Sequence, residues 1–121
     1  MITADSRPLA VPDLRRLLVA AEQWLARNRE AINAINVYPV PDGDTGTNML
    51  LTLRSAIEAG ERGGATAVGA YLQAFARGAL LGARGNSGVI LSQLLRGFAA
   101  ALEEDEVIDL NGFCRGLDGG A

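Results

Sequence analysis

Apolar side chains recur every three or four residues along most of the chain, which is the pattern of amphipathic α-helices. The first such run covers residues 12–35, and Pro12 with Asp13 suits the first turn of a helix. Its apolar positions are Leu14, Leu17, Leu18, Ala21, Trp24, Leu25, Ile32 and Ile35. We therefore predict a helix that buries one face, with Trp24 in the core rather than stacked on a ligand.

Four more helices are expected from the same pattern. The second begins near Thr47 and ends at Gly60, the third covers about 66–80, the fourth about 87–103, and the fifth begins near Leu110. Asp109 or Asn111 is the expected N-cap of the fifth helix. The residues expected to be buried on these helices are Leu50, Leu53, Ile57, Val68, Tyr71, Leu72, Phe75, Ala79, Val89, Ile90, Leu94 and Phe98.

No segment alternates apolar and polar residues as a half-buried β-strand would. The chain has 121 residues, enough for one domain with a single modest core. We expect residues 1–11 to be loosely ordered and residues 12–121 to form a helical domain. The sequence predicts an all-α fold, an antiparallel helical bundle or barrel with short connections.

Charge excludes some partners. The net charge is −3, the pI is near 4.8, and the arginines do not cluster, so a nucleic-acid partner is not expected. The longest apolar stretch, over about 75–95, carries Arg77, Arg84 and several glycines, so it does not predict a membrane span. The first residues do not follow the pattern of a signal peptide, and we expect a cytoplasmic protein.

Two missing residue types exclude whole mechanisms. The chain has no histidine, which removes Ser–His and Cys–His nucleophile pairs and most zinc sites. It has no lysine, which removes a Walker-type phosphate loop and Schiff-base chemistry. Cys114 is the single cysteine, so the chain cannot form an internal disulfide, and we expect a small buried side chain there.

The segment "NVYPVPDGDTGTNM", residues 36–49, places Asp42 and Asp44 two residues apart beside Pro39 and Pro41. In extended backbone such residues point the same way, so the two carboxylates would repel unless a cation joined them. Paired hard oxygen ligands suit Mg²⁺, whose remaining positions go to water and phosphates. A turn followed by a helix N-cap explains the same residues about equally well. An EF-hand calcium loop fits worse, because the spacing of its ligands is absent.

A helix opens directly after these aspartates. Its unpaired N–H groups and positive dipole end would face an anion. Thr45, Thr47 and Asn48 fall in its first turn, where their side chains could bond phosphate oxygens. The segment is therefore a candidate site for metal and phosphate together.

The second candidate is "GARGNSG", residues 82–88, followed by an apolar helix. Glycines three residues apart let successive backbone N–H groups line a concavity that binds anions. Arg84 could supply positive charge, and Asn86 and Ser87 could bond phosphate oxygens or cap the helix. A plain tight corner is the more frequent reason for such a sequence. In an up-and-down bundle, however, both candidate segments lie at the same end, which favours a shared site.

Both segments together resemble the ATP-binding domain shared by dihydroxyacetone kinases, in their L subunit, and bacterial fatty-acid kinases. The similarity is greatest to the N-terminal domain of the fatty-acid kinases, and it is carried by the motifs "NVYPVPDGDTGTNM" and "GARGNSGVILSQLLRGF". It spans about residues 10–121. The resemblance implies a helical barrel that binds ATP with Mg²⁺ ions. By position it implies metal ligation by Asp42 and Asp44, a place near the phosphates for Asn48, and a phosphate loop that includes Asn86, Ser87 and Gly88. Asp42 and Asp44 are also the predicted catalytic residues. With the residues proposed above from the helix start and the glycine-rich segment, the predicted nucleotide-binding set is Thr45, Thr47, Asn48, Arg84, Gly85, Asn86, Ser87 and Gly88.

Two positions separate this chain from the dihydroxyacetone kinase branch. That branch has a third metal-binding aspartate where Asn36 stands here, and a histidine where Thr45 stands. Asn36 is therefore the expected third metal position. The resemblance implies transfer of the ATP γ-phosphoryl to a fatty-acid carboxylate or a dihydroxyacetone-like acceptor, with the acyl chain delivered by a carrier protein or the acceptor by a substrate-binding kinase subunit.

Length is a further departure. The resembling barrels have about eight helices, and about five are expected here, so the chain is expected to be an incomplete version of the barrel. A non-catalytic nucleotide-binding or regulatory fragment is accordingly the alternative function. An open barrel would expose a core face, and a homodimer is one expected way of covering it.

Overall fold

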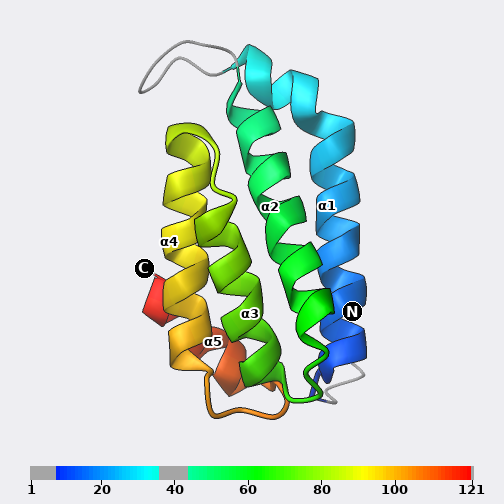
Figure 1. The fold of residues 1–121 in the computed structure, drawn as a ribbon, viewed down its shortest axis with the longest axis vertical. Helices are drawn as coiled ribbons and strands as arrows, with labels where there is room; N and C mark the ends of the chain where they lie inside the picture. The colour runs from blue at the N-terminus through cyan, green and yellow to red at the C-terminus, as the bar shows by residue number, and fades with distance from the viewer. Residues whose placement is uncertain (1–7, 36–43, 121) are drawn as a thin grey trace.

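The computed structural model describes residues 8–35 and 44–120 (Figure 1). Its helices are α1 (Val11–Ala34), α2 (Thr45–Gly63), α3 (Val68–Leu81), α4 (Gly85–Ala101) and α5 (Leu110–Gly120). Helices α1 to α4 run alternately up and down, and α5 packs against α4. Within the described ranges the only β-type pairing is an isolated antiparallel bridge between Leu9 and Ile108. The predicted all-α, antiparallel fold is confirmed.

Helix α2 is the centre of the bundle because it packs against α1, α3 and α4. Its buried apolar residues include Leu50, Leu53 and Ala56, and Ile57 packs against the core at its edge. The prediction for α3 is confirmed at every position, since Val68, Tyr71, Leu72, Phe75 and Ala79 are all buried. Among the described helices, the contact between α2 and α3 is the most extensive.

The predicted burial on α4 is wrong for three residues. Val89, Ile90 and Leu94 are each about half exposed, at 49%, 59% and 46%. The residues that α4 buries are small, Gly88, Ser92 and Ala99, which lets the helix approach α2 and α3 closely and turns the larger side chains outward. Phe98 is partly buried, with its ring edge-to-face against Phe113 at 5.9 Å between centroids.

Helix α1 also buries less than its periodicity predicts. Trp24 is 56% exposed, Leu17 55% and Ile35 76%, so the expectation of a core tryptophan is wrong for this chain. Among the described helices, α1 is covered mainly by α2. At 100° per residue, Leu14 and Leu25 lie along the covered line, while Leu17 and Trp24 share a flank roughly 70–90° away from it.

Cys114 is exposed, which corrects the expectation of a buried thiol. Helix α5 buries Gly112 and Gly116, and Gly116 lies against Phe98 of α4. Cys114, two residues from each of these glycines, lies on the opposite side of the helix. Asp109 is confirmed as the cap of this helix, since its Oδ1 accepts a hydrogen bond of 2.7 Å from the N–H of Gly112.

The start of the described chain is held in place by backbone hydrogen bonds. The N–H of Leu9 donates to the carbonyl of Ile108 at 2.7 Å, and the N–H of Ile108 donates back at 2.9 Å. Leu9 is therefore hydrogen-bonded to the segment before α5, although it falls within residues 1–11, which are predicted to be loosely ordered. Among the described helices, none is long and apolar enough to cross a membrane.

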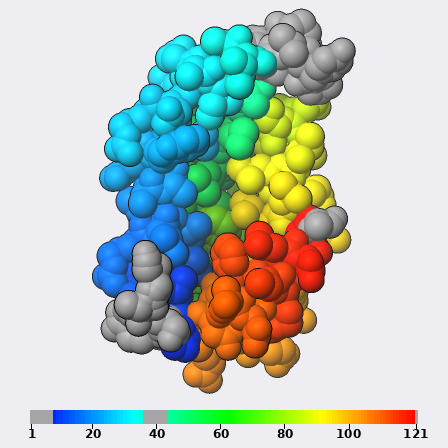
Figure 2. Space-filling model, turned by 180° about the vertical axis from the view of Figure 1, so that it is seen from behind, coloured from blue at the N-terminus to red at the C-terminus, as the bar shows by residue number. Residues whose placement is uncertain are grey.

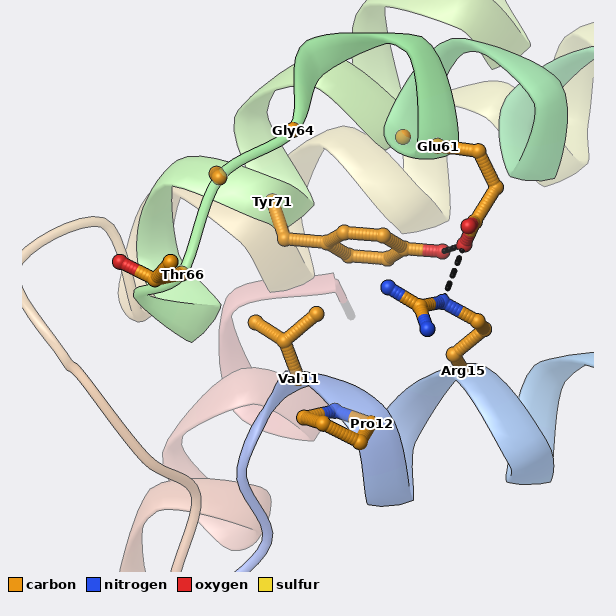
Figure 3. Close-up of a pocket in the computed structure, with 9 residues that line it drawn as sticks. Val11, Pro12, Arg15, Glu61, Gly64, Thr66 and Tyr71 are labelled. Carbon is orange, nitrogen blue, oxygen red and sulfur yellow. Dashed lines mark hydrogen bonds and ion pairs between the residues drawn. The ribbon is translucent and has the colours of Figure 1, made fainter.

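A cavity of about 380 Å³ lies where α1 begins and α2 ends (Figure 3). The ring of Tyr71 forms one wall and is 1% exposed. Its hydroxyl donates to Oε2 of Glu61 at 3.2 Å, and Nε of Arg15 donates to the same oxygen at 2.7 Å. Burial, and then the negative charge of Glu61, raise the pKa of Tyr71 to about 12.

This pKa predicts an alkaline loss of stability. Because the folded protein holds the phenol proton more tightly than the unfolded chain, Tyr71 contributes stability that is fully present below pH 10 and is lost as the pH rises to about 12. No lysine titrates in this window. Urea unfolding of the native protein and of Tyr71→Phe between pH 9 and 12 should show a smaller decline for the variant, and equal declines would contradict the assignment.

Candidate functional site

The first turns of α2 and α4 lie at the same end of the bundle (Figure 1). Asp44 is the N-cap residue of α2, and Arg84 is the N-cap residue of α4. We call residues 82–88 the glycine corner. The structure brings this corner directly against α2, as the alternating helix directions predicted.

Two glycines allow this contact. Gly85 has a φ of +65°, in the left-handed region, and a Cβ there would collide with the side-chain amide of Asn48. A Cβ at Gly88 would collide with Oγ1 of Thr52. The backbone of the glycine corner therefore lies directly against α2. At Gly85 and Gly88 any side chain would push the corner away from the helix.

Hydrogen bonds hold the corner in this position. The N–H of Arg84 donates to Oγ1 of Thr52 at 3.1 Å, and Thr52 Oγ1 donates to the carbonyl of Asn48 at 2.8 Å. Thr52 is completely buried. One hydroxyl thus joins the first turn of α2 to the start of α4.

The first turn of α2 is also held by α1. Oδ1 of Asn33 accepts a hydrogen bond of 3.2 Å from the N–H of Thr47, and Nδ2 of Asn33 donates to Oγ1 of Thr47 at 3.1 Å. Gly46 is buried against the carbonyl of Arg29. The Thr47 N–H is therefore satisfied inside the protein, which differs from the expectation that the first-turn amides face a ligand.

The other predicted site residues divide between described and undescribed positions. Asp44 and Thr45 are partly buried, and the Asp44 carbonyl accepts a hydrogen bond of 2.9 Å from the N–H of Asn48. On the corner, Asn86 is exposed and Ser87 is partly buried. Asp42 and Asn36 lie outside the described residues, so their pairing with Asp44 stays a prediction.

The side-chain atoms at this end that could ligate a metal ion are hard oxygens. The carboxylate of Asp44, the hydroxyls of Thr45 and Thr47 and the amide oxygen of Asn48 all belong to α2 or its cap. Mg²⁺ prefers such ligands and accepts one or two carboxylates beside phosphate oxygens. The residues from 44 onward therefore fit this ion in type, while the described ranges contain no group of three or more acidic, histidine or cysteine side chains arranged so that it could hold a metal ion.

The electrostatic character of this end favours anions. Two helix N-termini lie at this end, and the aligned peptide dipoles of each helix give its N-terminus a partial positive charge. Arg84 is exposed. Within residues 8–35 and 44–120, no carboxylate pairs with its guanidinium. The end of the bundle can accordingly bind a polyanion such as a chain of phosphates.

Two residues that hold this end of the bundle together were not predicted from the sequence. Thr52 is a polar residue within the buried face of α2. Its place among the apolar residues Leu50, Leu53 and Ala56 is the feature of the sequence that could have indicated a buried hydrogen-bonding role. Asn33 carries no comparable signal, because an asparagine in the last turn of a helix is ordinarily solvated.

Comparisons with known proteins identify the family of this chain. The family model of the DAK2 domain, a kinase-family domain, matches residues 39–121. An uncharacterised protein of Staphylococcus saprophyticus is 46% identical over 104 residues, which cover 86% of this chain and 19% of that protein. Protein YloV of Bacillus subtilis is 43% identical over 118 residues, covering 98% of this chain and 20% of that protein.

The chain spans about a fifth of the length of these curated relatives. The family match includes the first turn of α2, the whole glycine corner and helices α2 to α5, and it begins after α1. On this match and these identities, the chain belongs to the DAK2-domain family.

Proposed function

We propose that this chain forms the Mg²⁺-dependent ATP-binding part of a phosphotransferase. It would present the ATP γ-phosphoryl for transfer to an acceptor oxygen, either a fatty-acid carboxylate or the hydroxyl of a dihydroxyacetone-like molecule. The DAK2 match supports the kinase class. The resemblance of residues 36–49 and 82–98 to the fatty-acid kinase branch is the reason for naming that acceptor first.

One observation carries the proposal. The glycine corner packs without intervening side chains on the first two turns of α2, so two helix N-termini and Arg84 converge on one small region. Phosphates bound between them would accept hydrogen bonds from backbone N–H groups and face two positive dipole ends. This arrangement needs no lysine, which accords with a chain that has none.

The metal would be held by Asp44 together with Asp42, with Asn36 as the third position and Asn48 beside the phosphates. When bound, Mg²⁺ would neutralise the charge that develops on the phosphate oxygens during transfer. The role of the chain is then to position the reactants. The glycine corner would hold the phosphates, and the N-cap of α2 would hold the ion. A carboxylate acceptor is already ionised at neutral pH and needs no general base.

Calorimetry with Mg²⁺ and ATP on the purified protein tests the proposal. Binding that requires Mg²⁺ supports it, and absence of any metal-dependent binding would reduce the chain to a helical structural domain. A second measurement adds a fatty acid on its carrier protein and follows acyl-phosphate formation. Binding without transfer would favour the alternative, a non-catalytic nucleotide-binding or regulatory module.

Replacing Asp44 by asparagine keeps its size and removes its charge. We expect Asp44→Asn to weaken MgATP binding by at least about tenfold, since a direct metal ligand loses its charge. Glu58→Gln is the matched control, because Glu58 lies on the same helix, far from its first turn, and pairs only with Arg62 on the surface. Equal affinities of the two variants in calorimetry would contradict the metal assignment.

Arg84→Gln tests the positive charge at the corner. A charge-assisted hydrogen bond to phosphate is strong enough that its loss should weaken ATP binding by about tenfold or more. Arg62→Gln removes the same charge at the other end of α2, where the arginine makes an exposed ion pair of little energetic value. The control should bind ATP as the native protein does, and an unaffected Arg84→Gln would exclude the residue from the site.

A further inference from the structure

We infer that Thr52 is the positioning residue that holds the glycine corner to α2, so that the metal end and the phosphate end of the site act as one unit. The inference rests on the proposed function and assigns a role to a residue outside the predicted site. Thr52 lies one helical turn after Asn48 and is 0% exposed, so it acts through its neighbours rather than on a ligand.

The hydroxyl of Thr52 has both a donor and an acceptor role. It accepts the hydrogen bond of the Arg84 N–H at 3.1 Å and donates its own proton to the Asn48 carbonyl at 2.8 Å. The result is a continuous chain from the N-cap of α4 through α2 to a residue beside the phosphates. Such linked hydrogen bonds polarise one another, and each is worth more in a buried setting than in water.

Side-chain size along α2 is matched to the corner at three successive points. A Cβ at Gly85 would meet Asn48, one at Gly88 would meet Thr52, and one at Gly82 would meet Ser55. Asn48, Thr52 and Ser55 are four and three residues apart, so they form one ridge on the face of α2. Within this ridge Thr52 accepts a hydrogen bond across the contact, from the N–H of Arg84, and donates one within α2, to the carbonyl of Asn48.

Loss of the Thr52 hydroxyl would leave the Arg84 N–H without a partner in a packed interface. An unsatisfied N–H there is costly, so the corner would separate from α2 to let water reach it. The start of α4 and the Arg84 side chain would then lose their fixed relation to Asp44. Local opening of this contact, rather than global unfolding, is the expected consequence.

Hydrogen exchange of the Arg84 amide in the ligand-free protein tests the clamp directly. Thr52→Val should speed this exchange by about tenfold, and Thr52→Ser, which keeps the hydroxyl, should restore it to near the native rate. Ser92→Ala is the matched control, because Ser92 is 1% exposed and its hydroxyl bonds only within α4, to the Val89 carbonyl. Native exchange at Arg84 in Thr52→Val would overturn the inference.

MgATP calorimetry on the same variants tests the consequence for the site. We expect Thr52→Val to bind about tenfold more weakly, with Thr52→Ser and Ser92→Ala close to the native protein. If native protein binds MgATP and Thr52→Val binds it equally well, the positioning role is wrong. If native protein does not bind MgATP, the proposed function fails, and the exchange rate of the Arg84 amide alone decides whether Thr52 holds the corner.

Discussion

The direct contact between the glycine corner and the polar ridge of α2 is the constraint on which the rest of the site depends. Gly85 and Gly88 have no Cβ to keep the chains apart, and the buried hydroxyl of Thr52 satisfies the N–H that this close approach would otherwise strand. Neither feature alone would suffice. Without glycine the surfaces collide, and without the hydroxyl the contact buries an unsatisfied amide.

The same preference for small residues explains the outer surface. Helices α4 and α5 approach their neighbours through Gly88, Ser92, Ala99, Gly112 and Gly116, and so their larger apolar side chains point away. Figure 2 shows α5 covering part of α4 on the rear face, next to the N-terminal half of α1. The predicted homodimer concerns this apolar exterior and stays a prediction.

The helices themselves could be predicted from the sequence, because three-and-four spacing reports amphipathic structure whatever the neighbours are. Burial could be predicted where a helix is surrounded, as for Phe75 on α3, and failed where it is not. Trp24 and Ile90 have the right spacing for a core face, yet no described element covers them. Periodicity gives the direction of a side chain relative to its helix, but coverage depends on tertiary contacts that the pattern does not contain.

The placing of the two candidate segments at one end of the bundle could be predicted from the sequence, whereas their role as a binding site stays a prediction. Alternating helix directions placed Asp44 and Gly85 at one end, and the structure brings Asn48 against Gly85. Thr52 and Asn33 were missed because each works through one or two hydrogen bonds between helices distant in sequence. A cocrystal structure with Mg²⁺ and a non-hydrolysable ATP analogue is the decisive measurement. We expect the phosphates to lie between the first turn of α2 and the glycine corner. Phosphates bound elsewhere, for example in the cavity beside Tyr71, would rule out the proposed site.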